Sequence, residues 1–64
     1  MGLDERILEY RARHGLSQED FANLVKVNVM TINAIENGKR EPLRITAKKI
    51  ETILNQEEKE NVEG

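Results

Sequence analysis

The apolar positions of this chain recur every three or four residues within four short segments, and polar turn residues separate the segments. This spacing places the apolar side chains of each segment on one face of an α-helix, and it favours helices over strands. The pattern therefore predicts an all-α fold, a compact bundle of about four short helices. The expected core positions are Ile7, Leu8 and Tyr10 or Arg11 in the first segment, Phe21, Ala22 and Val25 in the second, Ile32 and Ile35 in the third, and Leu43, Ala47, Ile50, Ile53 and Leu54 in the fourth.

Residues that favour helix ends bound the first two segments. Asp4 is the expected N-cap of the first helix, and Gly15 suits the left-handed backbone that would end it. Ser17 and Asp20 match a capping box at the start of the second helix, with Asp in place of the usual Glu. The second helix is expected to end near Val25.

The third and fourth segments carry similar signals. Asn28 is a favourable N-cap for the third helix, which is expected to stop at residues 37–38, an Asn-Gly pair. Pro42 suits the first turn of the fourth helix, whose start is predicted between residues 43 and 46.

Charge is unevenly distributed along the chain. The formal net charge is −2, and residues 55–64 hold four Glu and one Lys, whereas residues 1–54 hold nine basic and eight acidic side chains. The apolar repeat also stops after Leu54. Residues 1–54 are therefore predicted to form one domain, and residues 55–64 an acidic tail that is a frayed helix end or disordered. A near-neutral domain permits a local phosphate-binding patch without indicating one.

Composition and motifs argue against several classes of protein. The chain has no Cys and one His, so no disulfide, cysteine-based metal site or cofactor is expected. No apolar run reaches the roughly 20 residues of a membrane span and no signal peptide is indicated, which predicts a cytoplasmic protein without a membrane partner. His14, Ser17 and Asp20 superficially match a hydrolase triad, but they lie within seven residues and no oxyanion site accompanies them. The sequence predicts a protein that is not an enzyme.

The outward face of the third helix carries no charge, which is unusual for a face that only contacts solvent. Because Ile32 and Ile35 define the buried face at 100° per residue, the composition of the opposite face follows from the sequence. That face carries Met30, Asn33, Ala34 and Asn37, with Val29 on one flank. It is available for contact with another molecule.

The short second helix, the tight joint and the third helix match a helix-turn-helix. In this motif the second helix of the pair enters a major groove of DNA, and the first lies across the phosphate backbone. Backbone N–H groups at Ser17 and Gln18, at the start of the second helix, favour a phosphate. Lys39 and Arg40 follow the third helix, and Arg44 extends this cationic segment.

The stretch YRARHGLSQEDFANLVKVNVMTINAIENGKREP, residues 10–42, resembles the lambda-repressor-like, Cro-type (XRE) helix-turn-helix family of bacterial and phage regulators. The resemblance implies sequence-specific binding of double-stranded DNA by a transcriptional regulator, usually a homodimer on a palindromic operator. The positions that carry it are Leu16 to Gln18, Phe21, Ala22, Val25, Val27, Thr31, Ile32, Ile35 to Lys39 and Pro42.

The resemblance also assigns roles to individual residues. It implies an ion pair between Arg11 and Glu36 that links the first helix to the third. It implies phosphate contacts from Gln18, Asn37 and Lys39, to which the helix start and the cationic segment add Ser17, Arg40 and Arg44. Base contacts are expected from Asn28, Val29, Met30, Asn33 and Ala34.

Two sites depart from the family pattern. Lys26 stands where the joint between the helices usually has Gly, so left-handed backbone there would cost about 1 kcal/mol. Val29 and Met30 stand where hydrogen-bonding residues are frequent, so these two positions would contact bases only through apolar atoms.

Two other interpretations fit the same pattern. One is a helix-turn-helix used for protein contact, as in an antitoxin or anti-repressor module, with Val29 and Met30 in a protein interface. The other is a designed or truncated domain. For a dimeric regulator, the expected dimer surface is the fourth helix with the segment before it. Its apolar residues would be Leu43, Ile45, Ile53 and Leu54, which exceed what so small a core needs.

Overall fold

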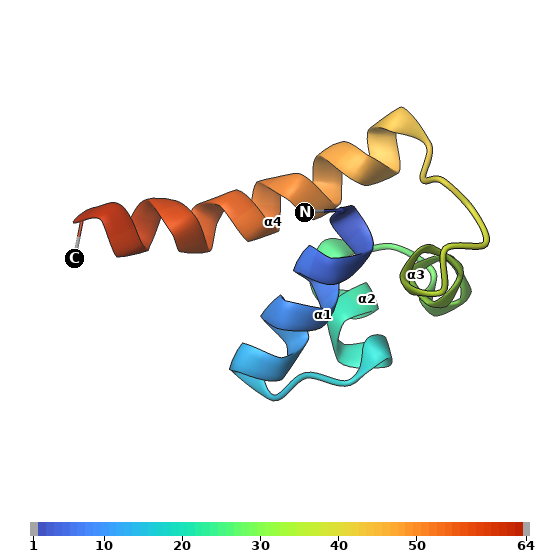
Figure 1. Cartoon of the computed structure of the whole chain (residues 1–64), viewed down its shortest axis with the longest axis horizontal. Helices are drawn as coiled ribbons and strands as arrows, with labels where there is room; N and C mark the ends of the chain where they lie inside the picture. Colours follow the sequence, from blue (N-terminus) through green and yellow to red (C-terminus); the bar gives the residue numbers. More distant parts are fainter. Residues whose placement is uncertain (1, 64) are drawn as a thin grey trace.

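Four α-helices follow one another along the chain. A computed structural model describes the backbone of residues 2–63 and the side chains of residues 2–56. No strand is present within residues 2–63, so the predicted all-α fold is confirmed. The helices are α1 (Leu3–His14), α2 (Gln18–Val25), α3 (Val29–Glu36) and α4 (Arg44–Glu63), shown in Figure 1.

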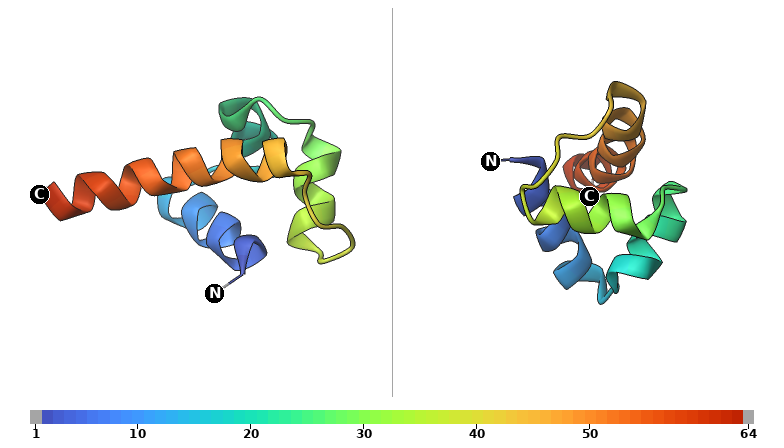
Figure 2. Two further views of the ribbon diagram at one scale, coloured as in Figure 1. Left: turned by 90° about the horizontal axis from the view of Figure 1, so that it is seen from above. Right: turned by 90° about the vertical axis from the view of Figure 1, so that its right-hand side faces the viewer.

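One hydrophobic core holds the four helices together. Helix α3 packs against α1 and α2, and α4 lies across α1 and α2 (Figures 1 and 2). Complete burial of a large aliphatic or aromatic side chain contributes about 1.5–3 kcal/mol, which makes this core the main source of stability in so short a chain. The buried residues are Ile7, Phe21, Ala22, Val25, Ile32, Ile35, Ile50 and Leu54, and each is a predicted core position.

The predicted caps of α2 and α3 are confirmed. The Ser17 hydroxyl accepts a hydrogen bond from the Asp20 backbone N–H at 3.0 Å, and the Asp20 carboxylate accepts one from the Ser17 N–H at 3.2 Å. This reciprocal pair satisfies two backbone donors that a helix start leaves unpaired. Gly15 ends α1 in the left-handed conformation. Asn28 precedes α3, and its side-chain oxygen accepts from the Met30 N–H at 2.7 Å.

Two predictions for α1 are wrong. The N-cap is Gly2, whose carbonyl accepts from the Arg6 N–H at 3.1 Å, so Asp4 lies inside the first turn. An Asp is favourable at both places, because the positive end of the helix dipole also attracts a carboxylate in the first turn. Leu8 is 46% exposed and is not a core residue. Ile7 fills the inward position, and Leu8 lies 100° further around the helix.

The start of α4 also differs from the prediction in part. The helix begins at Arg44, within the expected range, and the Ala47 N–H donates to the Leu43 carbonyl at 2.8 Å. Pro42 therefore lies before the helix and not in its first turn. Leu43 is 74% exposed and belongs to the loop end, so it is not a core residue. Ala47 is half-buried, and Ile50 is the first fully buried residue of α4.

Helix α4 has 20 residues and is longer than the short helix predicted. Leu54 is its last buried residue among residues 44–56, and the backbone continues as helix to Glu63. Figures 1 and 2 show this C-terminal part of the ribbon extending beyond the other three helices. The division into a domain at residues 1–54 and a frayed or disordered tail at 55–64 stays a prediction.

Replacing Lys26 by glycine is expected to leave the free energy of unfolding unchanged or to raise it by up to about 1 kcal/mol. Lys26 ends α2 with a φ of 60°, in the left-handed region, and its side chain is exposed. Glycine adopts this conformation without the strain that a Cβ atom causes. Gly15→Ala is the matched control, since Gly15 has a φ of 65° and open space around a Cβ atom. It should lower the free energy by about 1 kcal/mol. Denaturant unfolding measures both, and a clear loss for Lys26→Gly would contradict the strain argument.

Candidate nucleic-acid interface

Helices α2 and α3 with their joint form the predicted helix-turn-helix, and α3 lies at one end of the molecule. Only Lys26, Val27 and Asn28 separate the two helices. The Val27 N–H donates to the Ala22 carbonyl at 2.9 Å, which closes the end of α2 and turns the chain into α3. Figure 2, right, shows α3 crossing the front of the molecule, with α1, α2 and α4 beside and behind it.

The outward face of α3 presents apolar and amide side chains. Met30 is 76% exposed, and Asn33 and Asn37 are also exposed. Val29 and Ala34, predicted base contacts, are half-buried, and Val29 also packs against the core. Glu36 is the only charged residue of α3, and its side chain points inward. A major groove admits such a helix face without desolvating a charge.

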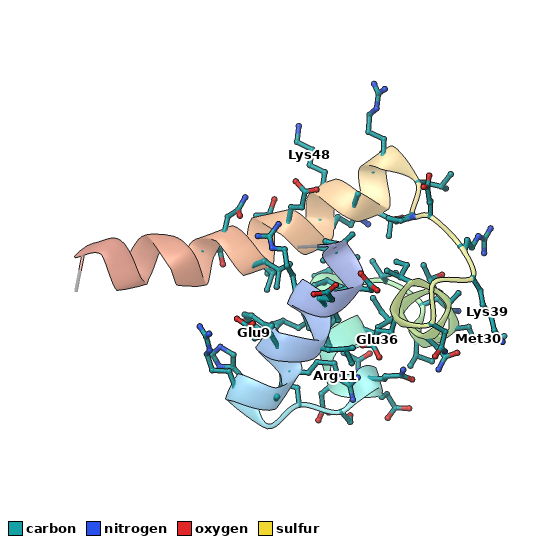
Figure 3. The ribbon with its side chains drawn as sticks, viewed as in Figure 1. Glu9, Arg11, Met30, Glu36, Lys39 and Lys48 are labelled. Carbon is teal, nitrogen blue, oxygen red and sulfur yellow. The ribbon has the colours of Figure 1, made fainter. Side chains whose placement is uncertain are left out.

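The structure brings Arg11 and Glu36 together. Arg11 Nη1 donates to both carboxylate oxygens of Glu36, at 2.8 and 2.9 Å, and Arg11 Nε donates to the Leu16 carbonyl at 3.2 Å. The two side chains meet between α1 and α3 in Figure 3, and they are 21% and 5% exposed. Glu36 is the last residue of α3, where the helix dipole opposes a negative charge. Arg11 therefore compensates both the burial of the carboxylate and its unfavourable position.

Three amide side chains continue this ion pair toward the outward face of α3. Gln18 Nε2 donates to Glu36 Oε1 at 2.8 Å, and Gln18 Oε1 accepts from Asn33 Nδ2 at 3.2 Å. Asn33 Oδ1 accepts from Asn37 Nδ2 at 3.1 Å, and Asn37 Nδ2 also donates to the Asn33 carbonyl at 2.9 Å. These contacts were not predicted from the sequence. Gln18 and Asn37 were expected to contact phosphates, and Asn33 a base.

The start of α2 presents backbone donors as the motif requires. Ser17 and Gln18 lie beside α3, but the Ser17 hydroxyl caps its own helix and both ends of the Gln18 amide bind protein groups. A phosphate here would be held by the N–H groups of the first turn and by the helix dipole. This part of the interface relies on the backbone.

The predicted cationic segment follows α3 closely. The Lys39 N–H donates to the Ala34 carbonyl at 3.0 Å, which fixes Lys39 beside the end of α3. Lys39, Arg40 and Arg44 have exposed side chains. In Figure 3, Lys39 and Met30 lie at the same end of the molecule. The structure thus places Lys39 next to the outward face of α3.

Comparison with known proteins identifies the family. A helix-turn-helix family model matches residues 7–60, which is most of the chain. The chain belongs to the XRE-type helix-turn-helix family.

Two curated relatives of this helix-turn-helix protein come from archaea. An uncharacterised HTH-type transcriptional regulator of Archaeoglobus fulgidus is 42% identical over 50 residues, which cover 78% of this chain and 71% of the relative. An uncharacterised HTH-type transcriptional regulator of Methanocaldococcus jannaschii is 45% identical over 40 residues, which cover 62% of this chain and 61% of the relative. No solved structure gives a significant match. The findings support a DNA-binding regulator of transcription, from a family that is generally non-enzymatic.

The apolar surface expected for a dimer of the XRE-type protein is smaller than predicted. Leu54 is buried and Ile53 is half-buried against the core of the same chain, so these residues do not form an unpartnered surface. Leu43 and Ile45 are 74% and 71% exposed, at the end of the loop and the start of α4. Only these two members of the predicted set remain available for a partner.

The described residues can also be compared with a hydrolase triad, a metal site and a membrane span. Ser17 and Asp20 bind each other's backbone N–H groups, and the centroids of the His14 and Tyr10 rings lie 4.3 Å apart. Within the described part of the chain, no group of His, Asp or Glu side chains is placed to hold a metal ion. In that same part, no helix has the length and apolarity to cross a membrane.

Proposed function

We propose that this chain is a sequence-specific transcriptional regulator of the Cro or repressor type that binds double-stranded DNA with α3 in a major groove. The observation that carries this proposal is the outward face of α3, which is exposed, free of charge, and followed directly by Lys39 and Arg40. The uncharged face of α3 can contact bases in a groove, and the cations that follow it can bind the phosphates that border the groove. The bacterial or phage origin and the cytoplasmic location stay predictions.

Base contacts are assigned to five residues of α3 and its cap. Met30 and Val29 would contact thymine methyl groups, and Asn33 would hydrogen-bond to a base edge, with adenine favoured for Asn. The Asn28 side-chain oxygen is engaged by the Met30 N–H, so Asn28 would act through its NH2 group. Ala34 would allow close approach of the helix to the bases.

Phosphate contacts are assigned to the two ends of the motif. At the start of α2, beside Ser17, the Gln18 N–H and the helix dipole would hold one phosphate, because the Ser17 N–H is engaged by the Asp20 carboxylate. Beyond α3, the cationic side chains would bind the flanking strand, with Asn37 beside them. This second set consists of Lys39, Arg40 and Arg44. Asn37, the other predicted phosphate contact, already donates its NH2 group to both Asn33 oxygens.

A homodimer on a palindromic operator follows from the small size of the reading helix. One α3 of eight residues contacts only a few base pairs, which gives too low a specificity ratio in a genome. Two copies spaced by about one helical turn of DNA double the site. Leu43 and Ile45 are the apolar residues that we assign to the dimer surface.

Replacing Lys39 or Arg40 by alanine is expected to weaken binding to all duplexes alike. Each lost phosphate contact should reduce the slope of log affinity against log salt by about 0.9. Lys48→Ala is the matched control, because Lys48 projects from α4 away from Met30 and Lys39 in Figure 3. Fluorescence anisotropy across a salt series measures the slopes. Unchanged slopes in both variants would remove these residues from the phosphate contacts.

Replacing thymine by uracil in the half-site is expected to weaken binding by about 1 kcal/mol, the contribution of one buried methyl group. Val29→Ala and Met30→Ala should reduce discrimination between bases more than total affinity, and should reduce the thymine-to-uracil difference. Competition binding with matched thymine and uracil duplexes tests this. Equal binding of both duplexes by the parent protein would contradict the methyl contact, and would favour a protein interface for Val29 and Met30.

A further inference from the structure

The hydrogen bonds that run from Glu36 to Asn37 have a fixed direction. A carboxylate accepts and does not donate, so the Gln18 side chain must present its NH2 group to Glu36, at 2.8 Å. With its NH2 group on Glu36, Gln18 turns its oxygen toward Asn33, and this oxygen requires a donor there. Asn33 meets this requirement with Nδ2 at 3.2 Å, which leaves its oxygen to accept from Asn37 at 3.1 Å. The charge of Glu36 thus decides which end of each amide faces its neighbour.

The Asn33 side chain keeps one donor and one acceptor beyond these contacts. A primary amide has two N–H groups and an oxygen with two lone pairs. Among the described residues, Gln18 takes one N–H and Asn37 takes one lone pair. The remainder, one N–H and one lone pair, is the set that pairs with N7 and the N6 amino group of adenine. Asn33 is exposed on α3, where this set can meet a base edge.

We infer that Gln18 is a positioning residue that holds the Asn33 amide in one orientation and so sets the preference for adenine. This inference rests on the proposed function, because it concerns the base that α3 reads. By this inference, the Arg11–Glu36 pair has a second role besides stabilising the fold. Arg11 holds the carboxylate in place, and the carboxylate orients Gln18. A phosphate contact by the Gln18 side chain, expected from the sequence, would compete with this role, since both ends of its amide are engaged.

The variant Gln18→Met tests the inference, because Met has similar length and lacks both amide groups. Glu19→Gln is the control on the same turn of α2, where Glu19 is exposed. Relative affinities are measured for four duplexes that differ only at the base pair where Asn33→Ala loses discrimination. The parent should prefer adenine there by tenfold or more, and Gln18→Met should lose most of this preference while discrimination at other positions is kept. In the Asn33→Ala background, Gln18→Met should change the preference no further.

A second measurement needs no DNA. In the free protein, the side-chain amide of Asn33 should be ordered, with an NMR order parameter near that of rigid backbone, about 0.85. Gln18→Met should lower it below about 0.6, and Glu19→Gln should leave it unchanged. Denaturant unfolding of each variant checks that the fold is intact under the conditions used.

The outcomes separate the inference from the proposed function. If the parent selects no duplex, the proposed function fails, and the order of Asn33 alone decides whether Gln18 positions it. If Gln18→Met loses affinity equally for all four base pairs, Gln18 is a phosphate contact and the inference is overturned. An Asn33 amide that is equally ordered with and without Gln18 also overturns it.

Discussion

Arg11→Ala is expected to lower the free energy of unfolding by about 2–4 kcal/mol, and Glu36→Ala by about 1–3 kcal/mol. The effect of Arg11→Ala should be the larger one because Glu36, which loses its partner, is more buried than Arg11. Removal of Arg11 leaves a carboxylate that is only 5% exposed, at the negative end of the α3 dipole, with Gln18 as its remaining donor among the described residues. Removal of Glu36 leaves a guanidinium that is 21% exposed and still donates to the Leu16 carbonyl. The more buried charge loses more when its partner is removed.

Urea unfolding of the two single variants and the double variant gives the coupling energy between the pair. Glu9→Ala is the matched control, since Glu9 accepts from Arg13 at 3.0 Å in an ion pair on the exposed surface of α1. Such a surface pair contributes about 0.3–0.5 kcal/mol. A coupling energy between Arg11 and Glu36 no larger than the Glu9→Ala effect would contradict a stabilising role for the buried pair.

Phe21→Ala is expected to lower the free energy of unfolding by about 3–5 kcal/mol, the largest effect of any single truncation in this core. The Phe21 side chain is completely buried and contacts the Tyr10 ring edge-to-face, with centroids 5.6 Å apart. A chain of 64 residues has a total stability of about 3–10 kcal/mol, so the variant should be largely unfolded at the lower end of that range.

The control for Phe21 lies on the same helix. Leu24 is 45% exposed, and Leu24→Ala should lower the free energy by about 1 kcal/mol or less. Helical circular dichroism during thermal unfolding compares the two variants. A smaller loss for Phe21→Ala than for Leu24→Ala would contradict the location of the core.

Those features of the fold that depend on residues close together in the sequence could be predicted. The capping box of Ser17 and Asp20 and the Asn28 cap use hydrogen bonds within three residues, so the sequence contains both partners. The beginnings of α1 and α4 were less predictable, because Asp and Pro are each favourable at more than one place near a helix start. Asp4 and Pro42 illustrate this ambiguity.

The side-chain contacts within the candidate site were harder to predict from the sequence. Arg11 and Glu36 are 25 residues apart, and only the family resemblance connected them. The bonds from Gln18 to Asn33 and Glu36 depend on how α2 crosses α3, which periodicity does not determine. One signal was present in the sequence. Glu36 and Asn37 follow Asn33 by three and four residues at the end of the predicted third helix, so a donor from a neighbouring helix could join them.

The most direct test of α3 as a DNA-reading helix is selection of duplexes from a random pool at two salt concentrations. We expect enrichment of an A/T-weighted palindrome, with half-sites about one helical turn apart, that persists at the higher salt while unspecific binding falls. A pool that shows no enriched sequence at either salt concentration would contradict sequence-specific DNA binding by this protein.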